Sequence, residues 1–154
     1  MKWLTQTLGI LLLAGVSAVI LYLCVGEPDR SFVCVQSELK EHHVCLETVA
    51  KDWQGDVLWV DARSESEFKK DHVDGALWVS ETDAEEQLAD PVNMEQIGMS
   101  GVSEQKLVVY CATDACGSSE VVAEKIRETG FHSEVYVLQG GWKALQAAKL
   151  KVAE

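Results

Sequence analysis

Short apolar runs that alternate with segments of helical character constrain the fold more than any other feature of this chain. The runs with strand character are Val57–Val60, Lys106–Tyr110 and Glu134–Leu138. Val57–Val60 is apolar on both faces, which is typical of a strand in a parallel sheet that is covered on both sides. The alternation therefore predicts a three-layer α/β domain with a mainly parallel central sheet.

The expected helices fill the intervals between these strands. Ser64 is placed as an N-cap, and Glu67 three residues later completes a capping box. Gly130 suits the position that ends a helix. The predicted helices are Leu46–Trp53, Ser64–Lys70, Asp83–Ala89, Ser118–Thr129 and Trp142–Lys151, with a further short strand in Gly75–Val79 and helical character in Ser37–His43. The stretch after Pro91, through Gly98 and Gly101, is expected to be rich in loops.

An uncharged apolar run, Leu8–Val25, lies close to the N-terminus. Its length is at the lower end of what spans a bilayer as a helix. A cleaved signal peptide is the alternative, but cleavage after Ala18 would leave the apolar Val19–Val25 at the new N-terminus. We therefore favour an uncleaved transmembrane anchor in residues 1–26, a polar juxtamembrane connector in residues 27–43 and a folded domain in residues 44–154.

The charges beside this run predict its orientation. Lys2 and the amino terminus are positive, whereas Glu27, Asp29 and Arg30 together carry a net negative charge. The positive-inside rule then keeps the N-terminus in the cytoplasm. It places the domain outside the cytoplasm, in the periplasm if the protein is bacterial. The protein would be a single-pass membrane protein whose membrane contact is residues 8–25.

The composition excludes some classes of partner and cofactor. The net charge of −12 and the isoelectric point near 4.7 disfavour nucleic acid as a partner. Cys34 and Cys45 could form a disulfide in an exported domain and would be reduced in the cytosol. The spacing of the five cysteines fits no common zinc signature and includes no Cys-x-x-Cys. No metal or organic cofactor is implied.

Cys111 is the candidate nucleophile. It directly follows the run Lys106–Tyr110. A loop of small residues comes next, and helical character begins at Ser118. A strand-to-helix turn offers backbone N–H groups and a helix N-terminus, which favour a thiolate. The alternative is a buried cysteine that acts only as a small hydrophobe. The candidate active-site loop comprises Ala112, Thr113, Asp114, Ala115, Cys116, Gly117 and Ser118.

Several motifs occur in an order that resembles the rhodanese (sulfurtransferase) family. They are Asp61-x-Arg63, His72 to Ala76, Tyr110-Cys111 and Gly140-Gly141-Trp142. The resemblance covers about residues 44–146. It implies that Cys111 attacks the outer sulfur of a donor such as thiosulfate and carries it as a persulfide. The sulfur then passes to a thiol acceptor or to cyanide.

The resemblance also implies supporting roles. Asp61 and Arg63 would form a buried ion pair or hydrogen-bond clamp that holds the active-site loop. The match to His72, Gly75 and Ala76 implies a framework motif in which His72 faces solvent or caps a helix. Gly140 and Gly141 would form the turn beside the catalytic loop.

The active-site loop departs from the family pattern in four respects. Many catalytic members have an arginine before the helix to bind an anionic donor, whereas Ser118 stands at that place here. The loop is about two residues longer, and Asp114 adds a charge that opposes an anionic donor. Cys116 is an addition that could resolve an oxidised Cys111 as a disulfide. The alternative is that Cys116 packs under the loop and does not react.

Three functions remain open at this point. The first is a membrane-tethered, single-domain sulfurtransferase that takes sulfur from a small thiosulfate-like donor and passes it to a thiol acceptor. The second is a thiol-disulfide or redox-sensing module that uses Cys111 and Cys116. The third is a non-catalytic rhodanese-like scaffold for binding at a membrane.

Overall fold

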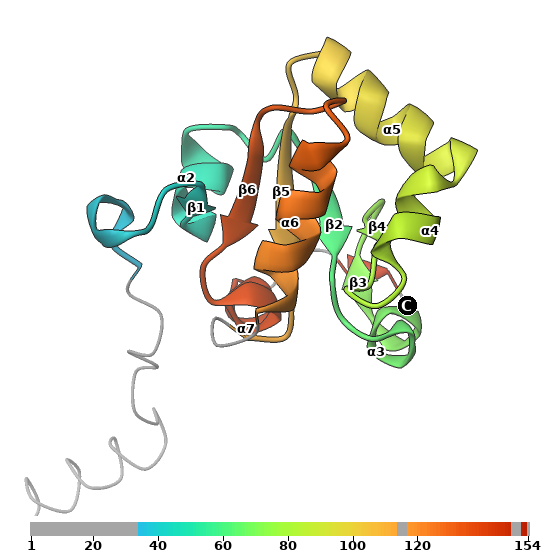
Figure 1. Ribbon diagram of the computed structural model, residues 1–154. Helices are drawn as coiled ribbons and strands as arrows, with labels where there is room; N and C mark the ends of the chain where they lie inside the picture. The colour runs from blue at the N-terminus through green and yellow to red at the C-terminus, as the bar shows by residue number, and fades with distance from the viewer. Residues whose placement is uncertain (1–33, 114–116, 149–151, 154) are drawn as a thin grey trace, which may run out of the picture. The chain divides into compact units, whose positions relative to one another are not determined.

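A five-stranded parallel sheet lies at the centre of the computed structural model, which describes residues 34–113, 117–148 and 152–153 (Figure 1). The strand order is β1-β6-β5-β2-β4. The strands are β1 (His43–Val44), β2 (Val57–Asp61), β4 (Leu77–Trp78), β5 (Lys106–Tyr110) and β6 (Val135–Leu138). A separate antiparallel pair joins β3 (His72–Val73) to β7 (Val152–Ala153). The predicted α/β class and mainly parallel sheet are confirmed.

Helices cover both faces of the sheet, so the predicted three layers are confirmed. One face packs against α4 (Ala84–Ala89), α5 (Pro91–Val102) and α6 (Ser118–Glu128), and the other against α2 (Leu46–Lys51) and α7 (Gly141–Ala147). Figure 1 shows α6 lying across β5 and β6. Val108 and Val109, adjacent in β5, are both fully buried but belong to different hydrophobic clusters. Each such side chain contributes about 1.5–3 kcal/mol to stability.

Local sequence patterns predicted most ends of helices and strands to within two residues. Helix α3 (Glu65–Lys70) has Ser64 as its N-cap, and Oε2 of Glu67 accepts hydrogen bonds from the Ser64 backbone N–H (3.2 Å) and hydroxyl (2.6 Å). Gly130 follows α6 with a φ of 72°, as expected of a residue that ends a helix. Strand β5 has the predicted bounds.

The prediction of a loop-rich stretch after Pro91 is wrong, because residues Pro91–Val102 form α5. Pro91 is the first residue of α5, a position where its missing N–H costs nothing. The side chain of Asp90 accepts from the backbone N–H groups of Val92 and Asn93 and so caps α5. Burial of Ile97 on the sheet then stabilises a helix that contains two glycines.

The two glycines of α5 are expected to respond in opposite ways to alanine. A Cβ on Gly101 would lie 2.6 Å from the carbonyl oxygen of Phe131, whereas a Cβ on Gly98 would meet nothing within 4 Å. Gly98→Ala should therefore raise the free energy of unfolding by about 0.5–1 kcal/mol. Gly101→Ala should lower it by about 1–3 kcal/mol. Urea denaturation measures both, and a stabilising Gly101→Ala would contradict the close approach.

The last helix is shorter than predicted. Helix α7 begins at Gly141 and ends at Ala147, whereas the sequence predicted a helix over Trp142–Lys151. The chain is redirected into an antiparallel pair, in which Val152 lies opposite Val73 of β3. Pairing with a strand that lies far away in the sequence is not encoded in the local periodicity.

The structure extends the folded unit on its N-terminal side. The compact unit begins at Cys34, and a Cys34–Cys45 disulfide with a Cα–Cα distance of 5.7 Å closes the segment that leads into α2. The helical character expected in Ser37–His43 is limited to η1 (Gln36–Glu38), because the chain turns at His42 with a φ of 60° and enters β1. Residues 34–43 therefore contribute to the domain.

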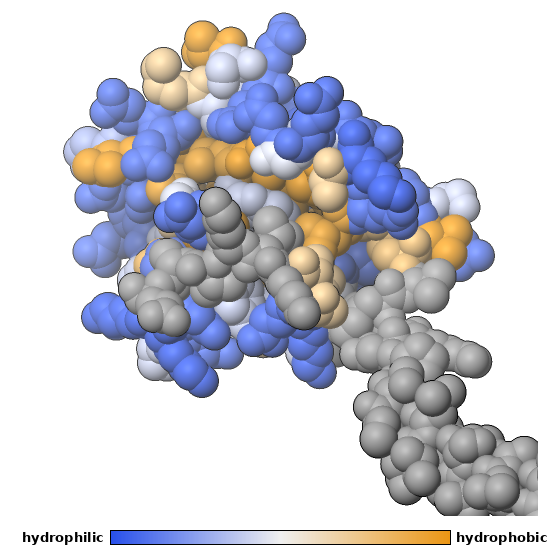
Figure 2. Space-filling view, turned by 180° about the vertical axis from the view of Figure 1, so that it is seen from behind, coloured by the Kyte–Doolittle hydropathy of each residue, from blue (hydrophilic) through white to orange (hydrophobic). Residues whose placement is uncertain are grey.

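The predicted anchor, Leu8–Val25, lies outside the described residues. Within residues 34–113, 117–148 and 152–153, no helix combines the length and the apolar character that crossing a bilayer requires. Seen from behind, the surface is largely hydrophilic, with a hydrophobic band between the hydrophilic residues (Figure 2).

Candidate active site

Cys111 directly follows β5, at the edge of the sheet where the parallel strands end. This is the edge at which ligands bind in open α/β sheets. Cys111 is 1% exposed. Its thiol donates to the carbonyl oxygen of Thr113 at 3.0 Å, and the hydroxyl of Ser119 donates to Sγ at 3.6 Å. Donation from Ser119 would strengthen when the sulfur becomes a thiolate.

Helix α6 begins beside this thiol. Gly117 is its N-cap, and Ser118 is its first residue. The N-terminus of an eleven-residue helix carries a partial positive charge that favours an anion nearby. Ala112 and Thr113 are half-buried. The remaining loop positions, Asp114, Ala115 and Cys116, lie outside the described residues, so a Cys111–Cys116 disulfide stays a hypothesis.

The Asp-x-Arg motif forms the buried ion pair that the resemblance implied. The Arg63 side chain is 2% exposed, that of Asp61 is 0% exposed, and Nη2 of Arg63 lies 2.7 Å from Oδ2 of Asp61. Nε of Arg63 donates to both carboxylate oxygens at 3.0 Å, and the Arg63 backbone N–H donates to Oδ1 at 2.9 Å. Asp61 therefore accepts both charged and backbone donors, which a buried carboxylate requires.

Aromatic rings connect this ion pair to Cys111. The Arg63 guanidinium lies 3.9 Å from the ring centroid of Trp142, and that ring stacks on Tyr110 at 5.8 Å. The backbone N–H of Trp142 donates to the carbonyl oxygen of Cys111 at 2.7 Å. The stack thus places Trp142 against both the guanidinium and the backbone of the candidate nucleophile.

The same buried arrangement raises the pKa values of two side chains, Arg63 and Tyr110. Burial acts against the charged form of Arg63, but the hydrogen bonds and charge of Asp61 outweigh it and raise the pKa of the guanidinium. Burial, followed by the charge of Asp61, raises the pKa of the Tyr110 phenol. The Tyr110 hydroxyl accepts a hydrogen bond from the backbone N–H of Val73 at 3.2 Å. Both groups therefore keep one protonation state at neutral pH, which suits a structural role.

Gly140 and Gly141 form the turn between β6 and α7, with φ values of 82° and 53°. A Cβ on Gly141 would collide with the carbonyl oxygen of Cys111 and would lie 3.3 Å from the backbone nitrogen of Thr113. Glycine is required there for two reasons, the positive φ and the close approach of the Cys111 loop.

His72 has a framework position. Its Nδ1 lies 2.9 Å from the carbonyl oxygen of Phe68, in the last turn of α3, and its ring stacks on Phe68 with a centroid distance of 4.0 Å. His72 therefore caps the end of α3, as the resemblance implied. Gly75 makes the following turn with a φ of 76°, and Ala76 packs against the hydrophobic cluster that contains Tyr110.

Glu81 is a neighbour of the active-site loop that the sequence did not indicate. Its Oε2 accepts a hydrogen bond from the hydroxyl of Ser118 at 2.6 Å. Ser118 stands where many family members have a donor-binding arginine, so a carboxylate lies close to the position of that cation. Glu81 opens the acidic cluster Glu81–Glu86, and no spacing in the sequence connects it with α6. No pattern in the sequence indicated the hydrogen bond from Ser119 to Cys111 either.

Solved structures support the fold at low sequence identity. A Bacillus halodurans protein matches with 20% identity and a TM-score of 0.55, covering 73% of this chain and 76% of its own. A Lactobacillus plantarum protein matches with 22% identity and a TM-score of 0.54, covering 73% and 87%. The rhodanese-like domain of an Anabaena sp. protein matches with 20% identity and a TM-score of 0.53, covering 74% and 80%.

No curated protein matches the chain. The family comparison is decisive, because the rhodanese-like domain family matches residues 47–148. This span contains Asp61, Arg63, Cys111 and the two glycines of the following turn. The chain belongs to the rhodanese-like domain family.

Proposed function

We propose that the protein is a single-domain sulfurtransferase in which Cys111 carries sulfane sulfur as a persulfide from a small donor to a thiol acceptor. The observation that carries this proposal is the position of Cys111, at the carboxyl edge of the sheet with the Ser119 hydroxyl donating to its sulfur. A nucleophile on that turn meets the N-terminal end of α6, which favours the thiolate.

The chemistry consists of two displacements at sulfur. The Cys111 thiolate attacks the outer sulfur of the donor, a new S–S bond forms, and the donor leaves with the electron pair of its old bond, as sulfite when the donor is thiosulfate. An acceptor thiolate then attacks the outer sulfur of the persulfide and releases the Cys111 thiolate. The carboxylate of Glu81 beside Ser118 disfavours a dianionic donor, so we expect a donor of lower negative charge than thiosulfate.

The proposed location is the extracytoplasmic side of a membrane, with residues 8–25 as the anchor. The Cys34–Cys45 disulfide supports this location, because disulfides persist in oxidising compartments and are rare in the cytosol. The acidic chain suits a domain that remains in solution beside anionic lipid headgroups.

Intact-protein mass spectrometry tests the proposed transfer. We expect the full-length protein, reduced and briefly exposed to excess thiosulfate or a small organic persulfide, to gain the mass of one sulfur atom. Cys111→Ser should abolish the gain, whereas Cys116→Ser should retain it. Subsequent addition of a thiol should return the protein to its original mass, because the acceptor removes the outer sulfur.

Two other outcomes would favour the alternative functions. A loss of two hydrogens on mild oxidation that requires both Cys111 and Cys116, without any gain of sulfur, would indicate a redox module. A Cys111 that neither gains sulfur nor oxidises would indicate a binding scaffold. Either result would refute the sulfurtransferase proposal.

A further inference from the structure

A cavity of about 680 Å³ lies at the edge of the central sheet, beside β4. Residues of α3, β4, α4 and α5 line it. They include two aromatic side chains, Phe68 and Trp78, and four carboxylates. The volume is in the range of ligand-binding clefts. Three features of the cavity, which are the strand edge, the aromatic rings and the carboxylates, indicate what it binds.

Strand β4 has one open side (Figure 1). It stands last in the strand order, and within the described part of the chain only β2 pairs with it. The backbone N–H of Val79 donates to the carbonyl oxygen of Asp61 in β2 at 3.0 Å. Because the backbone groups of successive strand residues point to opposite sides, those of Trp78 point away from β2. Backbone groups at an open edge can pair with a strand of another chain.

Two aromatic rings flank this edge. The rings of Phe68 and Trp78 stack with a centroid distance of 6.2 Å, and both residues are half-buried. The indole N–H of Trp78 donates to the carbonyl oxygen of Arg63 at 2.9 Å and so fixes the orientation of the ring. The face of an aromatic ring attracts a cation such as a lysine ammonium or an arginine guanidinium.

The charges of this cavity are negative. Glu65, Asp83, Glu86 and Asp90 line it, and the described lining residues include no Lys, Arg or His. Glu65 pairs with Lys69 on α3, but both side chains are more than half exposed, so this weak pair can exchange with a cation of a ligand. A cleft lined by charges of one sign raises the local concentration of ligands of the opposite sign.

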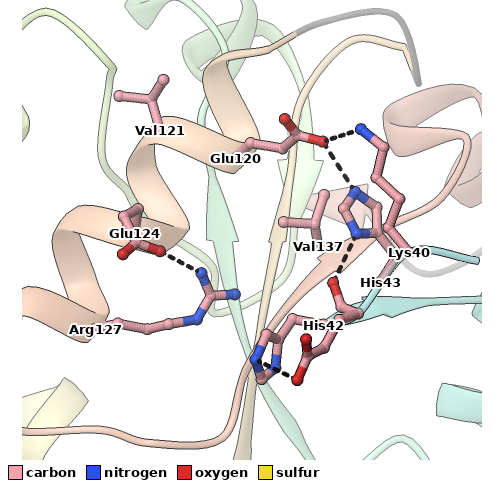
Figure 3. A pocket seen from close by; sticks show the side chains of 9 residues that line it. Lys40, His42, His43, Glu120, Val121, Glu124, Arg127 and Val137 are labelled. Carbon is pink, nitrogen blue, oxygen red and sulfur yellow. Dashed lines mark hydrogen bonds and ion pairs between the residues drawn. The ribbon is translucent and has the colours of Figure 1, made fainter.

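The cavity on α6, which Figure 3 shows, differs in its charges. Its carboxylates pair with cations of this chain. Glu120 contacts Lys40 and His43, each at 3.2 Å, and Glu124 contacts Arg127 at 2.9 Å. Charges that are paired within a cavity give little preference for the charge of a ligand. The cavity beside β4 is therefore the better candidate for selective binding of a cation.

We propose that the open edge of β4 binds an extended, basic segment of a partner protein. The segment lies beside β4 as an added strand and pairs with the backbone N–H and carbonyl of Trp78. Alternate side chains of a strand share one face, so lysines or arginines at alternate positions reach the cavity together. There they contact the carboxylates of Glu65 and Glu86 and the aromatic rings. This interaction goes beyond the sulfurtransferase function and does not depend on it.

The open edge favours a peptide over a free polyamine. A polyamine matches the carboxylates and the ring faces, but it has no carbonyl to accept from the N–H of Trp78. A peptide strand satisfies the backbone groups and the charges at once, which is how strand addition combines affinity with side-chain specificity.

The synthetic peptide acetyl-Lys-Val-Arg-Val-Lys-amide tests this proposal. The full-length protein, in micelles of a nonionic detergent and with its Cys34–Cys45 disulfide intact, is titrated with the peptide and followed by NMR. We expect saturable binding, with the largest shift changes at the backbone amides of Leu77 and Trp78. Hydrogen exchange of the Trp78 amide should slow, because that group gains a hydrogen-bond partner.

Two double variants test the carboxylates. Glu65→Gln/Glu86→Gln should weaken peptide binding by about three- to ten-fold, because exposed ion pairs contribute modestly. Glu47→Gln/Glu128→Gln is the matched control. It removes the same charge from exposed positions on α2 and α6, and Glu47, like Glu65, pairs with a lysine four residues further on. Because salt screens distant charges, the control should change the Kd by less than about two-fold. Circular dichroism checks that both variants fold.

Two further ligands separate strand pairing from attraction between charges. The same peptide methylated on every backbone nitrogen keeps its cations but has no N–H to donate to the Trp78 carbonyl, so it should bind at least about ten-fold more weakly. Spermine should also bind more weakly than the peptide. Equal binding of the three ligands would indicate a site for small cations and would overturn the proposal. Absence of saturable binding at millimolar peptide, or an equal loss in the control variant, would overturn it as well.

Discussion

Arg63→Met is expected to lower the free energy of unfolding by about 3–5 kcal/mol, because it leaves the Asp61 carboxylate buried without its charged partner. Asp61 is fully buried, and Arg63 supplies three of the side-chain hydrogen bonds that it accepts. The substitution also removes the cation that lies 3.9 Å from the Trp142 ring centroid. Urea denaturation followed by circular dichroism measures the change.

Two further variants make this result specific. Lys69→Met removes an ion pair with Glu65 in which both side chains are more than half exposed, at 70% and 55%, and should cost less than about 1 kcal/mol. Asp61→Leu combined with Arg63→Met should cost less than Arg63→Met alone, because it leaves no unpaired buried charge. A loss below about 1 kcal/mol for Arg63→Met would show that the carboxylate finds other partners or water.

Local sequence patterns were sufficient where neighbouring residues determine the outcome. The run Lys106–Tyr110 became β5 without a change of bounds, because consecutive apolar residues fit a strand that is buried on both faces. The capping box at Ser64 and Gly130 after α6 each lie within a few residues of the helix end that they determine. The Asp61–Arg63 ion pair was implied by the family resemblance, and its partners are only two positions apart.

The sequence was insufficient where residues far apart in the chain meet. Helix α5 is stabilised by burial of Ile97, and the close approach of the Phe131 carbonyl oxygen requires a glycine at position 101. Neither contact is visible in the local pattern of a segment with two glycines. Glu81 reaches Ser118, and Lys40 reaches Glu120, only because the sheet brings β1 and β4 to opposite sides of β5. The cavity on α6 therefore had no counterpart in the motifs.

Gly141→Ala is expected to slow the modification of Cys111 by a small alkylating reagent or persulfide donor by at least about ten-fold, equivalent to 1.4 kcal/mol. The new methyl group would collide with the carbonyl oxygen of Cys111. To relieve this contact, the Cys111 loop must move away from Trp142, and the 2.7 Å hydrogen bond between them must lengthen. The rate is measured by intact-protein mass spectrometry at several times.

Gly75→Ala is the matched control for this substitution. Gly75 also has a positive φ, 76°, but an added Cβ there would meet nothing within 4 Å. It should therefore cost about 1–2 kcal/mol of stability through backbone strain alone and leave the reactivity of Cys111 unchanged. If both variants change the rate of Cys111 modification equally, a general effect on the fold is responsible. If only Gly141→Ala does so, the close approach of the α7 turn determines where the thiol lies.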